Sequence, residues 1–171
     1  HQKYSGKKLQ YFDPETNESY VPFVVETSIG LDRTFLLVLS SAYNEEKITK
    51  EDGTVDERVV LKIPAALAPV KLAIFPLVKK DGLPEKARKI MDELKFDFAC
   101  QYEEKDTIGK RYRRHDAIGT PFCITIDHQT LEDETVTIRY RDTMEQERVP
   151  ASKLRDIMIE KVSISNLLKK I

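Results

Sequence analysis

The hydrophobic pattern becomes regular from Val70 onward and alternates between strand-like and helix-like spacing. Short apolar runs bounded by turn residues predict buried strands, and apolar positions three and four residues apart predict amphipathic helices. Ala87, Ile90 and Leu94 show the helical spacing. The expected strands are Lys71–Leu77, Phe98–Tyr102, Phe122–Ile126, Glu134–Arg141 and Glu147–Val149, and the expected helices are Pro84–Phe96, Thr107–Ile118 and Pro150–Lys161.

The resulting order, β-α-β-α-β-β-β-α, predicts a single mixed sheet. Strands separated by helices need crossover connections and are therefore expected to be parallel neighbours. A turn at Asp142–Thr143 is expected to join the last strands as an antiparallel edge. We therefore expect residues 70–171 to form a complete α/β domain, a mixed five-stranded sheet with three helices.

The pattern before residue 64 is less regular and predicts part of another domain. His1–Tyr20 is polar and rich in turn residues, Val21–Thr27 has the composition of a strand, and Leu31–Tyr43 has that of a helix. The helix is apolar almost all round, which predicts burial in a core. Its neighbours are too short and too polar to cover it, so we expect residues 1–63 to be the remnant of a larger domain.

The stretch between that helix and Val70 is expected to lack a core of its own. Asn44–Arg58 is charged and is expected to be a surface loop, followed by a short strand at Val59–Ile63. Pro64–Pro69 brackets small residues between prolines, which is typical of a connector between domains. The predicted organisation is thus 1–63, a connector at 64–69, and 70–171.

Composition is that of an ordinary globular protein, with 40% apolar residues, 33% charged residues and a formal net charge of −1. No apolar run approaches the ~20 residues of a membrane span, and no signal peptide is recognisable. Cys100 and Cys123 lie in apolar runs and are expected to be reduced core residues of a cytoplasmic protein, with no metal site. A chain that begins with His1 is expected to be a fragment of a longer protein.

The strongest local charge is a basic block in the second predicted helix of the 70–171 domain. Such a block on a nearly neutral chain favours a polyanionic partner. Two arginines on the fourth strand and two nearby aromatic residues could add contacts to splayed single-stranded RNA bases. The alternative is a solvated helix face and surface arginines paired with nearby carboxylates. The candidates are Lys110, Arg111, Arg113, Arg114, Phe122, Arg139, Tyr140 and Arg141, with Arg111, Arg113 and Arg114 expected to point largely outward.

A second candidate site is the segment from Glu26 to Arg33, where a predicted strand ends and a helix begins. A helix N-terminus and a guanidinium group together suit an anion, and Glu26 with Ser28 suits a substrate ammonium group. The alternative is an ordinary strand–turn–helix in which Asp32 complements the helix dipole. No motif of nucleophilic or zinc-dependent catalysis is present.

Three stretches resemble a known family in the right order along the chain. VVETSIGLDRTFLLVLSSAY resembles the third signature motif of class II aminoacyl-tRNA synthetases, in the form used by the dimeric glycyl-tRNA synthetases. VVLKIPAALAPVKLAIFPL resembles the passage from their catalytic core into their anticodon-binding domain. IGKRYRRHDAIGTPFCITIDHQTLEDETVTIRYRDTMEQERV resembles the body of that domain. The resemblance implies that residues 1–63 derive from an antiparallel catalytic domain.

The resemblance also implies roles for single residues. Arg33 matches the arginine that contacts the triphosphate of ATP, and Gly30 matches a glycine that lets ATP approach the backbone. Glu26 and Ser28 match residues that recognise the amino group and the small size of glycine. Motifs one and two of the family are absent, so the chain alone is predicted to be inactive and to hold no cofactor.

The implied parent activates glycine with ATP and Mg²⁺ and charges a glycine tRNA, whose anticodon ends in two cytosines. It is expected to be a cytoplasmic homodimer with no membrane association. Two other readings stay open: a non-catalytic, synthetase-like accessory protein that binds nucleic acid, and a generic α/β ligand-binding module. Retention of Glu26, Ser28 and Arg33 argues against the accessory protein, which has no chemical need for that set.

Overall fold

The computed structural model describes residues 1–49 and 53–169 and divides them into two compact units, His1–Thr34 and Phe35–Ile171. The first unit contains a short helix α1 (Gln2–Ser5) and an antiparallel hairpin of β1 (Tyr11–Asp13) and β2 (Glu18–Tyr20). The strand predicted at Val21–Thr27 is wrong: residues 21–30 have no regular structure and are exposed. Its β-branched composition suits a strand, but a lone strand leaves its backbone groups unpaired.

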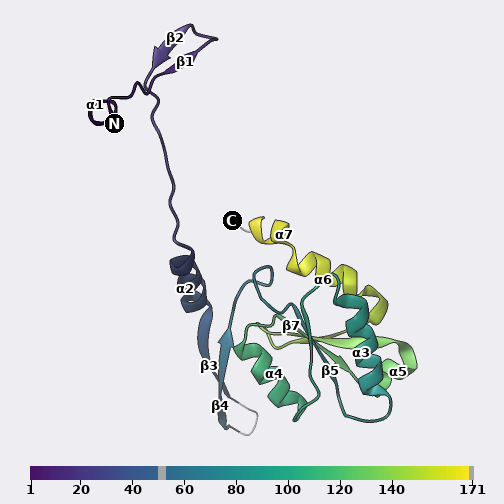
Figure 1. Cartoon of the computed structure of the whole chain (residues 1–171). Helices are drawn as coiled ribbons and strands as arrows, with labels where there is room; N and C mark the ends of the chain where they lie inside the picture. Colours follow the sequence, from purple (N-terminus) through teal and green to yellow (C-terminus); the bar gives the residue numbers. More distant parts are fainter. Residues whose placement is uncertain (50–52, 170–171) are drawn as a thin grey trace. The chain divides into compact units, whose positions relative to one another are not determined.

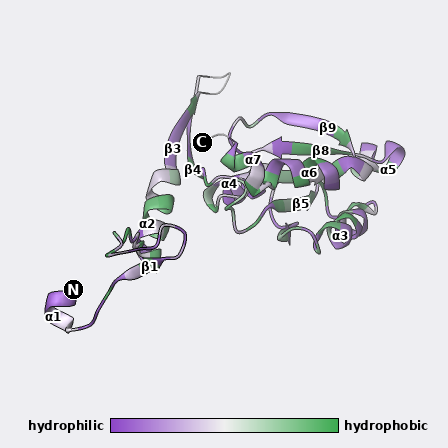
Figure 2. Cartoon of the chain, turned by 90° about the horizontal axis from the view of Figure 1, so that it is seen from above, coloured by the Kyte–Doolittle hydropathy of each residue, from purple (hydrophilic) through white to green (hydrophobic). Residues whose placement is uncertain are grey.

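Helix α2 (Leu31–Ala42) forms where the sequence predicts a helix, and its apolar side chains are left largely uncovered, as its short and polar neighbours predict (Figure 1). Phe35, Leu36 and Leu37 are 64–68% exposed, and Ala42 is the buried residue of the helix. Hydropathy colouring shows a hydrophobic band on the helix (Figure 2). An apolar helix face left open to this extent is typical of a contact surface.

The prediction of a surface loop at Asn44–Arg58 is also wrong. Strands β3 (Tyr43–Thr49) and β4 (Val55–Leu61) form an antiparallel hairpin, and part of its connection, residues 50–52, lies outside the described residues. The alternating exposure along both strands is the period-2 pattern of a half-buried ribbon. The alternation is hidden in the sequence because charged residues occupy the inner face as well as the outer one.

The sheet predicted for residues 70–171 is confirmed in its number of strands and in its mixture of parallel and antiparallel pairs. Its strand order is β6-β5-β7-β8-β9, with β5 parallel to β6 and β7 and with β8 antiparallel to both of its neighbours. The bounds are β5 (Leu72–Pro76), β6 (Cys100–Tyr102), β7 (Phe122–Ile126), β8 (Thr135–Tyr140) and β9 (Gln146–Pro150).

Helices cover the sheet on both faces (Figure 1). One face packs against α3 (Leu83–Leu94) and α6 (Leu154–Val162) in the main core, which includes Ile124 and Ile138. The other face packs Ala73, Phe75 and Cys123 against α4 (Ile108–Ala117). The three predicted helices are thus present, and the structure adds α5 (His128–Asp133), the 3₁₀ turn η1 (Ala151–Lys153) and α7 (Ile164–Leu168).

The division into two compact units does not coincide with the connector predicted at residues 64–69. The hairpin β3–β4 belongs to the same unit as the five-stranded sheet, and the division falls at residue 34. Residues 65–67 form a turn, and Lys71 Nζ donates to the carbonyls of Ala65 and Ala66 at 3.0 and 2.8 Å. Both cysteines are free, as expected, and burial raises the pKa of Cys123 to about 12.

Gly119 lies where the backbone of the sheet domain comes close to β4. It follows α4 with φ +82°, and a Cβ built there would lie 3.1 Å from the carbonyl oxygen of Leu61. We expect Gly119→Ala to lower the free energy of unfolding by about 1–3 kcal/mol, because it adds left-handed backbone strain and crowds β4. Denaturant titration measures the change.

Gly109 provides the matched control for that substitution. It lies in the first turn of α4, and nothing is within 4 Å of a Cβ built on it. Gly109→Ala should be neutral or stabilising by up to about 1 kcal/mol, since alanine is the better helix former. Equal effects of the two substitutions would contradict the argument from backbone conformation and close approach.

Candidate nucleic-acid interface

The exposed basic surface of the sheet domain lies on α4. Lys110 is exposed, and the side chains of Arg113 and Arg114 are 36% and 43% exposed. A shallow hollow of ≈ 570 Å³ opens beside them, lined by Asp56, Thr107, Gly109, Lys110, Arg113 and Arg114. Three cations around one hollow can hold an anion such as a phosphate group.

Neighbouring carboxylates fix the two arginines of this surface. Arg113 Nη2 donates to Asp56 Oδ2 at 2.5 Å, so a residue of β4 sets its direction. Arg114 bonds Glu103 and, at 2.9 Å, Asp106; the hydrogen bond to Glu103 is the main reason that the pKa of Arg114 is raised. Among the described residues, Lys110 has no ion-pair partner. Its charge is therefore the one in the hollow that is not already compensated.

Arg111 does not point outward, and that expectation is wrong. Its residue exposure is 2%. Burial is the main cause of a lowered pKa for this guanidinium. Helical geometry turns Arg111 toward the sheet edge, where backbone carbonyls satisfy it: Pro76 at 2.5 Å, and Glu104, Lys105 and Asp106 at 2.8–3.3 Å. Arg111 closes the carboxyl edge of the sheet.

Arg139 and Arg141 are also buried, at 6% and 3% exposure, which contradicts a free arginine face on β8. Arg139 donates to both carboxylate oxygens of Asp116 at 2.8 and 3.0 Å. Burial alone would lower the pKa of Arg139, but its bonds to Asp116 raise it. Arg141 bonds the carbonyls of Gly119 and Ile63 at 2.8 and 2.9 Å. Contact with RNA would require these bonds to break, so both roles stay predictions.

The two aromatic candidates lie on the opposite face of the sheet from Arg139. Phe122 and Tyr140 are paired across β7 and β8, with ring centroids 5.8 Å apart and nearly perpendicular planes. Tyr140 donates to Glu147 at 2.6 Å, and burial with this bond raises the pKa of Tyr140 to about 12. Lys161 Nζ lies 4.9 Å from the centre of the Tyr140 ring.

Tyr140 separates two adjoining hollows of ≈ 590 and ≈ 440 Å³ at the amino edge of β7. Both hollows are lined by Ala65, Phe122, Tyr140, Asp142 and Lys161. The sequence had joined these aromatic residues with the strand arginines into one surface. Alternation along β8 instead divides them, because successive side chains point to opposite faces. Sequence reasoning missed Lys161 and Asp56, and the charges of β4 do not alternate in a way that would have marked Asp56.

The residues from Glu26 to Arg33 do not form a closed site in the described structure. Glu26, Ser28 and Gly30 lie in the exposed segment without regular structure, and Arg33 is exposed in the first turn of α2. A hollow of ≈ 560 Å³ in the first unit is lined by residues between 1 and 24 and by none of these four. No cluster of three or more metal-binding side chains occurs among the described residues. Nor does any described helix have the length and apolarity to cross a membrane.

A family model described as "Anticodon binding domain" matches residues 71–170. The chain belongs to the anticodon binding domain family. The matched residues of this anticodon binding domain begin one residue before β5 and include α4, the five-stranded sheet and the C-terminal helices. The match leaves out the β3–β4 hairpin, although the hairpin and the domain form one compact unit.

Similarity to curated proteins extends beyond the matched domain to nearly the whole chain. A glycine–tRNA ligase of Chlorobaculum tepidum is 52% identical over 162 residues, which cover 95% of this chain and 33% of that protein. The glycine–tRNA ligase of Clostridium perfringens is 53% identical over 158 residues, covering 92% and 33%. That of Treponema denticola is 48% identical over 155 residues, covering 90% and 34%. The chain spans about a third of the length of these relatives.

A solved structure supports the fold of the anticodon binding domain. The RNA binding domain of threonyl-tRNA synthetase from Cryptosporidium parvum Iowa II superposes with a TM-score of 0.54, covering 58% of this chain and 25% of that one. The identity is 23%, so the likeness is one of architecture. It agrees with the mixed sheet and helices that the sequence predicts.

Proposed function

We propose that the chain is part of a glycine–tRNA ligase and binds the anticodon stem-loop of a glycine tRNA. The observation that carries the proposal is the 48–53% identity to glycine–tRNA ligases over 90–95% of the chain, across both compact units. A generic ligand-binding domain would share the architecture without sharing the sequence of both units.

The arrangement on α4 supports an RNA partner. Phosphate contacts supply much of the affinity for a nucleic acid, and Lys110 with Arg113 and Arg114 provides exposed cations beside a hollow. Tyr140 and Phe122 provide a second contact of a different kind, an aromatic pair at the edge of two hollows. Stacking of one base on such a ring contributes about 1–3 kcal/mol. The two surfaces lie on opposite faces of the sheet, so one stem-loop would not contact both at once. We expect it to bind at α4 in preference to the aromatic pair.

The proposed parent activates glycine with ATP and transfers it to its tRNA. Within it, Arg33 would contact the triphosphate, Gly30 would lie against ATP, and Glu26 with Ser28 would recognise glycine. Catalysis would rest on positioning of the reactants and on charge stabilisation at the phosphate. We expect the 171-residue chain to show no glycine-dependent pyrophosphate exchange, because four exposed residues cannot enclose both substrates. Exchange activity in a contaminant-free preparation would contradict this.

Filter-binding with glycine tRNA tests RNA recognition directly. We expect weak binding whose log K falls by about 0.7 per phosphate contacted for each tenfold rise in salt. The control is the same tRNA with both anticodon cytosines replaced by adenines, which should bind less tightly. Equal binding of both RNAs at all salt concentrations would reduce the proposal to non-specific attraction, and no binding would overturn it.

A further inference from the structure

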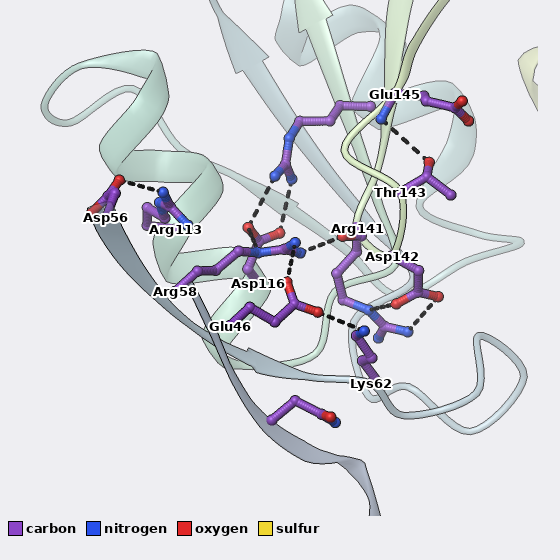
Figure 3. A network of polar contacts seen from close by, with 12 residues as sticks. Glu46, Asp56, Arg58, Lys62, Arg113, Asp116, Arg141, Asp142, Thr143 and Glu145 are labelled. Atoms are coloured by element: carbon purple, nitrogen blue, oxygen red, sulfur yellow. Dashed lines mark hydrogen bonds and ion pairs between the residues drawn. The ribbon is translucent and has the colours of Figure 1, made fainter. Parts of the chain in front are cut away.

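Arg58 of β4 is a buried arginine whose guanidinium group is fully bonded. It is 1% exposed, and each of its three guanidinium nitrogens bonds a different element (Figure 3). Nε donates to Asp116 Oδ2 of α4 at 2.9 Å, Nη1 donates to Glu46 Oε2 of β3 at 2.9 Å, and Nη2 donates to the backbone carbonyl of Arg141, which follows β8. Through Arg58, β4 is therefore bonded to α4, to the residue that follows β8, and to β3, its partner strand in the hairpin.

Asp116 links Arg58 to Arg139, one of the residues that the sequence suggested for RNA binding. It is fully buried and accepts one bond from Arg58 and two from Arg139. The direction of Arg139 thus depends on a carboxylate whose other contact comes from the hairpin. Without Arg58, Asp116 would keep only its two bonds from Arg139, and α4 would lose its fully buried ion pair with the hairpin.

A second hairpin residue has the same relation to a second RNA candidate. Asp56 of β4 holds Arg113 of α4 at 2.5 Å, beside the basic hollow (Figure 3). The inner face of β4 therefore presents Asp56 and Arg58, two residues apart, to α4. Neither residue lies in the region matched by the family model, which begins at residue 71.

We infer that Arg58 is a positioning residue for RNA binding, and that the β3–β4 hairpin is the support that holds α4 in its binding arrangement. The inference rests on the proposed function. A planar guanidinium can bond three partners in fixed directions, and a lysine ammonium group keeps the charge without this fork. Arg58→Lys therefore separates the charge of Arg58 from its geometry.

The experiment compares Arg58→Lys with the wild-type chain in two measurements. The first is the ratio of dissociation constants for the mismatched and the cognate anticodon stem-loop. We expect this ratio to fall about tenfold, which is a loss of about 1.4 kcal/mol of discrimination, while the salt dependence stays unchanged because no net charge is lost. Arg155→Lys is the matched control, since Arg155 makes a two-bond ion pair with Asp97 on the exposed surface, outside this network.

The second measurement, amide hydrogen exchange of the free protein, does not depend on RNA. We expect Arg58→Lys to accelerate exchange in the hairpin and in α4, with the β5 and β7 amides unchanged. Unchanged exchange in the hairpin and α4 would overturn the inference whether or not the wild type binds RNA. Accelerated exchange with an unchanged specificity ratio would overturn it too, since Arg58 would then stabilise the fold without positioning the contacts. Failure of the wild type to bind either stem-loop would overturn both the proposed function and its positioning residue.

Discussion

Replacing Asp116 with alanine is expected to lower the free energy of unfolding by about 3–5 kcal/mol. Asp116 is fully buried and is the shared carboxylate of Arg58 and Arg139, whose exposures are 1% and 6%. Its removal leaves buried Arg139 without a counter-charge and buried Arg58 with Glu46 alone. Denaturant unfolding followed by circular dichroism measures the loss as a shift of the midpoint at constant slope.

The control for this prediction is Asp97→Ala. Asp97 also pairs with an arginine through two bonds, but its partner Arg155 lies on the exposed surface. Water solvates the remaining charge of Arg155 after the change, so stability should scarcely move. If Asp97→Ala and Asp116→Ala cost the same, burial is not what makes the Asp116 cluster important, and the argument for Arg58 weakens with it.

Replacing Lys110, Arg113 and Arg114 together with glutamine is expected to weaken binding of glycine tRNA on the order of 100-fold at about 0.1 M salt. Each phosphate contact to a single strand changes log K by about 0.7 per tenfold change in salt, and three contacts are removed. The salt dependence should become shallower by the same three contacts. Filter-binding titrations between about 0.05 and 0.2 M salt measure both quantities.

The matched control removes the same charge from the other face of the sheet. Lys89 and Lys95 belong to or directly follow α3, and Lys153 lies in η1; all three are exposed. Their replacement with glutamine lowers the net charge equally but leaves α4 intact. Equal losses in the two triple variants would mean that RNA responds to overall charge, and α4 would cease to be the binding surface.

The α4 hollow and the Tyr140 hollows also differ in the elements that hold their lining residues in place. The α4 hollow is built from ion pairs between α4 and β4, so its geometry depends on contacts between residues about 57 positions apart. The Tyr140 hollows depend on a strand pair and on Lys161 of α6. Binding at the α4 hollow should therefore depend on the hairpin, and binding at the Tyr140 hollows should depend on the C-terminal helices.

Hydrophobic periodicity alone was sufficient for the sheet domain. Apolar runs and helical spacing predicted strands β5 to β9 and helices α3, α4 and α6, because each element buries one continuous apolar face. The same criterion failed for β3 and β4. Their inner faces carry Asp56 and Arg58, which pair with Arg113 and Asp116 of α4, and Glu46, which pairs with Arg58 and Lys62, so polarity there did not mean full exposure.

Sequence by itself therefore determined the class of fold, the order of the elements along the sheet domain and the family. It also identified which helix carries the basic block. Only the tertiary structure decided which arginines remain accessible. No local pattern distinguishes the buried arginines from the accessible ones, Arg113 and Arg114. The guanidinium groups of the buried three, Arg111, Arg139 and Arg141, are bonded to carbonyls and a carboxylate from distant segments. Local patterns cannot reveal such partners, because chain folding alone brings them together.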